Sequence, residues 1–195
     1  ANKLVVEEAT HRHIYRDARG EIELPQPNLH GPHQLRNAGL AVAMIRHQDE
    51  VSVSDEALIR GLTKAQWPGR CQELTKCPLT GEREVWIDGG HNPSAGDAMA
   101  EFWRSESLHV IIGMLANKNP EAILGPLRSC CASVTVVPVP GHDWHPVEAF
   151  GREATFAEDL PSAIAGLPKD SRPVFVTGSL YLVGEALRLN GQVPT

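Results

Sequence analysis

The sequence has no apolar run that approaches the ~20 residues a helix needs to cross a bilayer. It also has no Lys/Arg run longer than a pair, and its formal net charge is −6 at pH 7. Domains that bind nucleic acid normally carry a basic patch. We therefore expect neither a membrane span nor a nucleic-acid partner. The first residues also lack the apolar segment of a signal peptide.

Cysteine is sparse, and its spacing is uninformative for bridging. None of the four cysteines forms a C-x-x-C pair, and two of them are adjacent in the chain: Cys71, Cys77, Cys130 and Cys131. Adjacent cysteines rarely bridge each other, so the pattern argues against a disulfide framework and against a zinc ribbon. We expect a reducing, cytoplasmic compartment.

The chain lacks tandem repeats and low-complexity segments as well. What it contains is the composition of an ordinary globular protein, with 42% apolar and 22% charged residues. A length of 195 residues fits one large α/β domain, or one domain together with a piece of another.

The first third of the chain differs from the remainder. Residues 3–9 and 11–24 are short alternating segments with a turn in "DARGE", which predicts a β-hairpin or an edge meander. Apolar residues at helical spacing predict a helix over residues 33–47. Ser54 is a good N-cap for a second helix that ends near Lys64.

Beyond residue 67 strands and helices alternate. The strand segments are continuous runs of Val and Ile, which indicates that both faces of the sheet are covered. This alternation predicts an α/β fold with a Rossmann-like, mostly parallel, doubly wound sheet. The predicted strands are 84–88, 108–115, 133–139 and 172–178; the predicted helices are 93–105, 120–130 (capped by Asn119), 145–154, 157–167 and 179–189.

In such a sheet, ligands bind outside the carboxyl ends of the strands. The strand-to-helix turns are therefore where a site should be sought. Four turns qualify, those after Asp88, Gly113, Pro138 and Thr177. All four should open onto the same edge of the sheet.

The turn "DGGHNP" carries the most chemistry. Asp88 ends a strand, where a carboxylate can accept hydrogen bonds from a ribose diol. Gly89 and Gly90 allow positive φ and close backbone approach. Asn92 is placed to cap the next helix, whose N-terminus favours an anion, with His91 beside it. A tight turn with a capping Asn and a solvent-facing His is the alternative interpretation.

Three further residues are candidates on weaker signals. Ser179 follows the turn glycine of "TGS", where a plain N-cap explains it equally well. Arg70 in "WPGR" can bind a phosphate bidentately, or simply make a surface ion pair. Asn37 lies in the helix predicted over 33–47, where an amide could read a purine edge or merely be solvated.

The loop "PGHDWHP" gathers further polar residues. Together with Asp88 and His91, the side chains of His142, Asp143 and His145 could be imagined as a metal site, since His and carboxylate are competent ligands. Groups scattered over two loops do not have a ligand spacing, however. We therefore assign no metal ligands and expect a polar loop that rims a cleft.

With these residues assembled, the chain resembles the C-terminal part of a folylpolyglutamate synthase/dihydrofolate synthase, a family of the Mur-ligase superfamily. The resemblance rests on "HQLRNAGLAVA", "WPGR", "VWIDGGHNPSA", "GML" followed by "NK", "PGH" and "GSLYLVGEAL", in that order. It covers residues 33–189. The combination of D-G-x-H-N-P with G-S-L-Y-L is what makes it specific.

The resemblance implies an ATP-dependent amide ligase that converts a carboxylate to an acyl phosphate, which the amino group of L-glutamate then attacks. It implies that residues 1–66 are the tail of a central P-loop ATPase domain and that residues 67–195 are the C-terminal Rossmann-like domain. ATP, L-glutamate and dihydropteroate or folate would be the partners, and the complete protein would be a monomer.

The resemblance also implies roles for single residues. Asn37 would contact adenine, Arg70 the ATP phosphates, and Asp88 the nucleotide or its ribose. His91 would lie near the γ-phosphate and the incoming glutamate as the catalytic residue. Asn92 and Ser179 would help to bind glutamate.

The sequence contains no G-x-x-x-x-G-K-[ST] motif, and the family's magnesium ligands also lie upstream of the matched region. We therefore expect the polypeptide alone to be inactive. Two other hypotheses stay open: a Mur-type ligase that acts on a different acid, and a nucleotide-binding module without chemistry. Whether both synthase activities are present cannot be read from these motifs.

Overall fold

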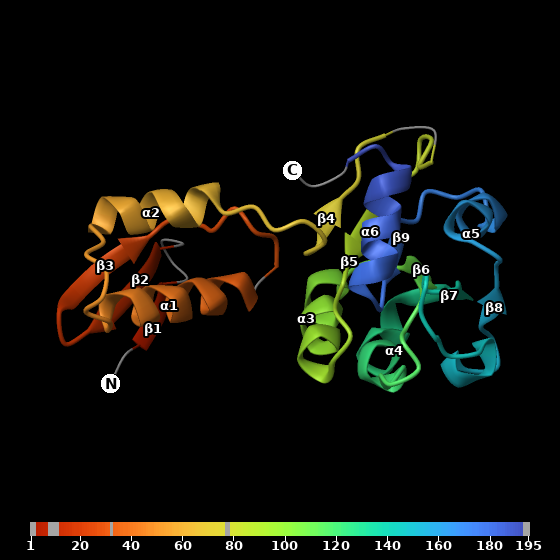
Figure 1. The fold of residues 1–195 in the computed structure, drawn as a ribbon, viewed down its shortest axis with the longest axis horizontal. Helices are drawn as coiled ribbons and strands as arrows, with labels where there is room; N and C mark the ends of the chain where they lie inside the picture. The colour runs from red at the N-terminus through yellow and green to blue at the C-terminus, as the bar shows by residue number, and fades with distance from the viewer. Residues whose placement is uncertain (1–2, 8–11, 32, 77–78, 193–195) are drawn as a thin grey trace. The chain divides into compact units, whose positions relative to one another are not determined.

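The chain divides into two compact units, Ala1–Trp67 and Pro68–Thr195. The structure is a computed structural model that describes residues 3–7, 12–31, 33–76 and 79–192 (Figure 1). No helix in these described ranges is both long and apolar enough to cross a membrane.

The first unit is an antiparallel sheet followed by two helices. Strands β1 (Lys3–Glu7), β2 (Arg12–Asp17) and β3 (Gly20–Leu24) are adjacent in that order. They are followed by α1 (His33–Arg46) and α2 (Asp55–Lys64). The core joins β2 and β3 to both helices through Tyr15, Ile22, Leu24, Val42 and Leu58.

Helix α2 begins where its cap dictates. The Ser54 hydroxyl accepts a hydrogen bond from the Ala57 backbone N–H at 3.2 Å, which satisfies one of the free donors of the first turn. Asp55 and Glu56 lie in that turn, where negative charge is favoured. Together with the three strands and α1, this helix completes the predicted meander and pair of helices.

A buried ion pair joins the sheet of this unit to α1. The Asp17 carboxylate accepts from Arg46 Nε at 2.9 Å and from Arg46 Nη2 at 3.1 Å, and its side chain is fully shielded from solvent. His47 Nε2 lies 3.3 Å from the same carboxylate. The hydrogen bonds from Arg46 lower the pKa of Asp17 from 3.8 to about 2.

We predict that this ion pair makes the first unit sensitive to acid. Because the pKa of Asp17 is lower in the folded than in the unfolded state, its contribution to stability is present above about pH 4 and is lost as the pH falls toward 2. Asp17→Asn should destabilise the unit at neutral pH and flatten its pH dependence in that window. Urea unfolding of wild type and variant at pH 2, 4 and 7 measures both effects. If the stability of Asp17→Asn depends on pH in the same way as that of wild type, the prediction is contradicted.

The second unit contains a six-stranded sheet in the order β4-β5-β9-β6-β7-β8. Only β4 is antiparallel to its neighbour; the other pairs are parallel. The strands are β4 (Gln72–Glu73), β5 (Val85–Asp88), β6 (Leu108–Ile112), β7 (Cys131–Val136), β8 (Thr155–Phe156) and β9 (Val174–Thr177).

Helices cover both faces of this sheet (Figure 1). One face packs on α3 (Pro93–Trp103) and α4 (Glu121–Leu127), the other on α5 (Leu160–Gly166) and α6 (Leu180–Leu189). The strands divide their side chains between the two cores, as in β9, where Phe175 belongs to the first and Val174 and Val176 to the second. The predicted mostly parallel, doubly wound α/β sheet is confirmed.

The sheet has a topological switch point between β5 and β9. Strand β5 leads into α3 on one face, whereas β9, its parallel neighbour, leads into α6 on the other. Asp88 pairs with Thr177 and Ile112 also pairs with Thr177, so the carboxyl ends of these strands are level. The predicted common edge therefore exists, and the switch point is where a doubly wound fold binds ligands.

Two details of the predicted elements are wrong. Residues 145–154 do not form a helix, because Gly151 adopts φ +107° after one 3₁₀ turn at Val147–Phe150, and a short edge strand, β8, follows instead. The α4 helix begins at Glu121, with Pro120 rather than Asn119 at the cap position. The Asn119 side chain nevertheless accepts from the Glu121 N–H at 3.1 Å.

We predict that Gly96 is irreplaceable at the contact between α3 and α4. A Cβ at this position would lie 2.1 Å from the Ala122 carbonyl oxygen, which is backbone and cannot move aside alone. Gly96→Ala should therefore destabilise the unit by about 1–3 kcal/mol. Gly184→Ala on α6 is the matched control, because its Cβ meets nothing within 4 Å, and it should stabilise by roughly 0.5–1 kcal/mol. Denaturant unfolding compares the two; equal effects would contradict the prediction.

Candidate functional site

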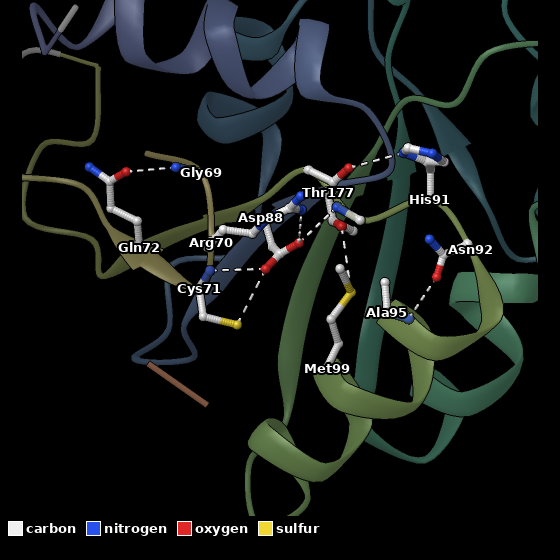
Figure 2. A network of polar contacts seen from close by, with 12 residues as sticks. Gly69, Arg70, Cys71, Gln72, Asp88, His91, Asn92, Ala95, Met99 and Thr177 are labelled. Atoms are coloured by element: carbon white, nitrogen blue, oxygen red, sulfur yellow. Dashed lines mark hydrogen bonds and ion pairs between the residues drawn. The ribbon is translucent and has the colours of Figure 1, made fainter. Parts of the chain in front are cut away.

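Asp88 is the centre of the switch-point edge. Its carboxylate is buried, with 4% of the residue exposed. One oxygen accepts from the Gly90 N–H at 2.7 Å and the other from the Cys71 N–H at 2.9 Å. The Cys71 thiol lies 3.5 Å from that second oxygen. Figure 2 shows Asp88 between the segment Gly69–Gln72 and the start of α3. A buried carboxylate held in this way is engaged by its own chain.

The segment before β4 is fastened to the turn after β5. The Gly89 N–H donates to the Gly69 carbonyl at 3.0 Å, and the Gly69 N–H donates to Gln72 Oε1 at 2.9 Å. Arg70 lies between these bonds, with Nη1 3.9 Å from Asp88 Oδ1 and 36% of its side chain exposed. A cation is thus held at the edge and still open to solvent.

The two glycines after Asp88 serve close packing rather than positive φ. Neither is among the positive-φ residues of the described chain, which corrects the sequence-based expectation. A Cβ on Gly89 would lie 2.3 Å from Leu180 Cδ2, and one on Gly90 would lie 2.6 Å from Ala95 Cβ. Glycine is required here because helices α3 and α6 both approach the turn.

His91 and Asn92 form the N-terminus of α3. The Asn92 side chain accepts from the Ala95 N–H at 3.0 Å, which confirms the predicted cap, and Pro93 follows at the first helical position. His91 is half-buried, and its Nδ1 lies 3.3 Å from the Gly89 carbonyl. If Nδ1 carries the proton, Nε2 retains a lone pair for a ligand.

Ser179 forms the corresponding start of α6 across the switch point. Gly178 turns the chain at φ +100°, and the Ser179 hydroxyl accepts from the Tyr181 N–H at 3.1 Å. Ser179 is buried, whereas Leu180 and Tyr181 are about half exposed. The predicted cap is present, and the N-termini of α3 and α6 both lie at the carboxyl edge of the sheet.

The loop after β7 has its own internal contacts. The His142 ring contacts the Tyr181 ring at a tilt of 37°, with ring centroids 3.8 Å apart, and His145 Nε2 lies 2.6 Å from the Lys118 carbonyl. Asp143 contributes its carbonyl to the Ala116 N–H. In the described part of the chain no group of three or more His, Cys, Asp and Glu side chains could hold a metal ion.

Asn37 lies in the first unit. It is exposed on α1, and its Nδ2 donates to Gln34 Oε1 at 3.1 Å. The other predicted site residues belong to the second unit and lie at the carboxyl edge of its sheet: Asp88, Arg70, His91, Asn92 and Ser179.

Sequence patterns missed two polar features of the second unit. Cys71 is a buried donor to Asp88 from 17 residues away, a contact that no local motif signals. At the opposite edge, His109 is 2% exposed, with Nδ1 2.7 Å from Ser133 Oγ and Nε2 3.0 Å from Asp170 Oδ1. This second cluster ties β6, β7 and the segment before β9 together.

The carboxyl edge is suited to anionic ligands. Two helix N-termini, a half-exposed arginine and a half-buried histidine lie there, and the nearby Asp88 charge is already engaged by backbone N–H groups. Helix N-termini and arginine both favour phosphate and carboxylate.

We predict that Asp88 stabilises this edge more than the Asn92 cap does. Asp88→Asn replaces one acceptor oxygen by an NH₂ group that faces a buried N–H, which should cost about 2–3 kcal/mol. Asn92→Ala should cost about 1 kcal/mol. Asp97→Asn, an exposed acid on the same helix, is the control and should change stability by less than about 0.5 kcal/mol. Chemical denaturation ranks the three; equal values for Asp88→Asn and Asp97→Asn would contradict the role of Asp88.

The fold and its edge define the class of protein. The mostly parallel, doubly wound, six-stranded sheet is the fold of a Mur-ligase C-terminal domain. No family model matches the chain. Individual proteins do match the chain, and their names indicate a narrower family than the fold does.

The chain is 30% identical over 185 residues to the folylpolyglutamate synthase of Lacticaseibacillus casei, covering 88% of this chain and 41% of that protein. It is 28% identical over 200 residues to the dihydrofolate synthetase of Saccharomyces cerevisiae, covering 88% and 47%. The crystal structure of Mycobacterium tuberculosis folylpolyglutamate synthase with ADP and AMPPCP superposes with a TM-score of 0.77 at 26% identity, covering 99% of this chain and 48% of that one.

The chain resembles the C-terminal part of a folylpolyglutamate synthase/dihydrofolate synthase, which confirms the resemblance inferred from its motifs. It spans less than half the length of each of these three relatives.

Proposed function

We propose that the chain is the part of an ATP-dependent ligase that binds glutamate and completes the nucleotide site. The reaction is the addition of L-glutamate to dihydropteroate or folate through an acyl phosphate. Residues 67–195 form the ligase domain, and residues 1–66 are the tail of a P-loop ATPase domain. The observation that carries the proposal is the pair of helix N-termini that flank the β5–β9 switch point beside Arg70.

The edge of the sheet offers Arg70 to the phosphates of a nucleoside triphosphate. Arg70 has a half-exposed guanidinium and can bind phosphate oxygens bidentately. ATP, when bound, supplies the phosphoryl group that activates the folate carboxylate. Asn37 would contact the adenine with its exposed amide. Each Asp88 oxygen already accepts one backbone N–H group, so a contact with the nucleotide or its ribose would use the remaining lone pairs.

Glutamate would bind at the two helix starts. Its carboxylates suit the positive ends of α3 and α6, next to Asn92 and Ser179. With Nδ1 donating to the Gly89 carbonyl, His91 Nε2 can accept the proton that the glutamate nitrogen loses as the new C–N bond forms and the C–O bond to phosphate breaks. His91 therefore has the catalytic role, as a general base.

Phosphoryl transfer needs more charge than this edge supplies. Stabilising a transferring phosphoryl group normally takes a P-loop, its lysine and Mg²⁺. The sequence contains no G-x-x-x-x-G-K-[ST] motif. We therefore propose that activity requires a P-loop region in the same protein and that residues 1–195 alone have no ligase activity.

We predict ligation when the P-loop region is present. A protein that carries this region together with the chain should consume MgATP and join radiolabelled L-glutamate to dihydropteroate, to folate, or to both. His91→Gln should lower kcat by roughly 100-fold, since general-base catalysis contributes about 10²–10⁴. His142→Gln, at an exposed imidazole in the loop after β7, is the matched control and should retain activity.

Chromatographic separation of the glutamylated products measures the reaction. Absence of ligation on both substrates by a well-folded protein contradicts the folate proposal. Activity on a different acid would indicate another Mur-type ligase. ATP binding without any turnover would indicate a nucleotide-binding module.

A further inference from the structure

Cys71 has an unusual backbone for its residue type. Among the described residues it is the one non-glycine with positive φ, at +40°. This left-handed region is unfavourable for residues with a Cβ, and most of all for β-branched ones. The residue is also buried, with 1% of its surface exposed. Such a conformation persists only where surrounding contacts enforce it.

The contacts that enforce it come from Asp88. The Cys71 N–H donates to Asp88 Oδ2 at 2.9 Å, and the thiol lies 3.5 Å from the same oxygen. Burial and the Asp88 charge raise the pKa of the Cys71 thiol, so the sulfur keeps its proton and can donate it. Figure 2 shows both contacts converging on one carboxylate oxygen.

The residue on the other side of Arg70 is also fixed. Gly69 adopts φ +74°, and a Cβ there would lie 2.5 Å from Val183 Cγ1 on α6. Its carbonyl accepts the Gly89 N–H, and its own N–H donates to Gln72. Two left-handed positions therefore flank Arg70: Gly69 is bonded to the turn after β5, and Cys71 is bonded to Asp88, the last residue of that strand.

We propose that Cys71 is a positioning residue for Arg70, acting through its left-handed backbone and its thiol, both bound to Asp88. Residue 71 sets the direction in which the Arg70 side chain leaves the backbone and so holds the guanidinium at the switch point. The part that concerns phosphate binding rests on the proposed function. The part that concerns the local structure does not.

Three variants of Cys71 separate its two contributions. Cys71→Ser keeps a small side chain with a hydroxyl donor. Cys71→Ala keeps the N–H and loses the side-chain donor. Cys71→Val loses the donor and disfavours the left-handed backbone. Cys130→Val is the matched control, because Cys130 is also buried but lies just before β7, at the opposite edge of the sheet.

The first measurement is amide hydrogen exchange in the ligand-free chain. We expect the amides of Cys71, Gly89 and Gly90 to exchange at least about tenfold faster in Cys71→Val, and within about twofold of wild type in Cys71→Ser. Cys71→Ala should be intermediate. Cys130→Val should leave these three amides unchanged even if it lowers the unfolding midpoint.

The second measurement is steady-state kinetics of the protein that carries the P-loop region. Cys71→Val should raise the KM for ATP about tenfold and leave the KM for glutamate within about twofold of wild type. Cys71→Ser should keep the KM for ATP close to the wild-type value. Arg70→Ala should raise the KM for ATP without accelerating exchange at Gly89 and Gly90. A uniform loss of activity in step with the unfolding midpoint would indicate a structural role and overturn the proposal.

The two proposals fail differently. If the folate-ligase function is wrong, all variants lack ligation, yet exchange still separates Cys71→Val from Cys71→Ser. If the positioning role is wrong, Arg70→Ala impairs ATP use while Cys71→Val alters neither exchange nor the KM for ATP.

Discussion

A buried carboxylate needs donors, and the way Asp88 obtains them organises the second unit. Its two oxygens draw in the Gly90 N–H from its own turn and the Cys71 N–H from the segment before β4. An unpaired charge at this depth would be strongly destabilising. The pairing therefore fixes the segment before β4 against the turn that leads into α3, and it leaves Arg70 half exposed beside that turn.

The doubly wound sheet places this arrangement at the carboxyl ends of its strands. Strands β5 and β9 are parallel neighbours whose helices leave to opposite faces, so the starts of α3 and α6 diverge from a common edge. Gly89 and Gly90 let both helices approach the turn. The chain is similar to folylpolyglutamate synthases in sequence and in fold over most of its length. Our functional proposal assigns the anionic partners to these turns.

Local sequence patterns predicted strands β5, β6, β7 and β9 of the second unit, most helices and the caps at Ser54, Asn92 and Ser179, because these depend on hydrophobic runs and on neighbouring residues. They did not predict the short strands β4 and β8. They failed at residues 145–154, where the backbone of Gly151 ends a helical pattern. They did not reveal the contact between Asp88 and its donor Cys71, because the two residues are distant in sequence and come together only when β4 and β5 pair. The assignment of Asp88 to the nucleotide stays a prediction. The roles of the site residues remain proposals for the same reason: a motif places a side chain at an edge but does not say what it binds.

The central claim is that the Asp88 carboxylate binds its own chain. Scalar couplings across hydrogen bonds test it directly in an isotope-labelled sample, between the Asp88 Cγ carbon and the amide nitrogens of Gly90 and Cys71. We expect both couplings in the free chain and again after ATP is added. If both are absent from the free chain, or if both vanish when ATP binds, Asp88 is available to a ligand and the claim is contradicted.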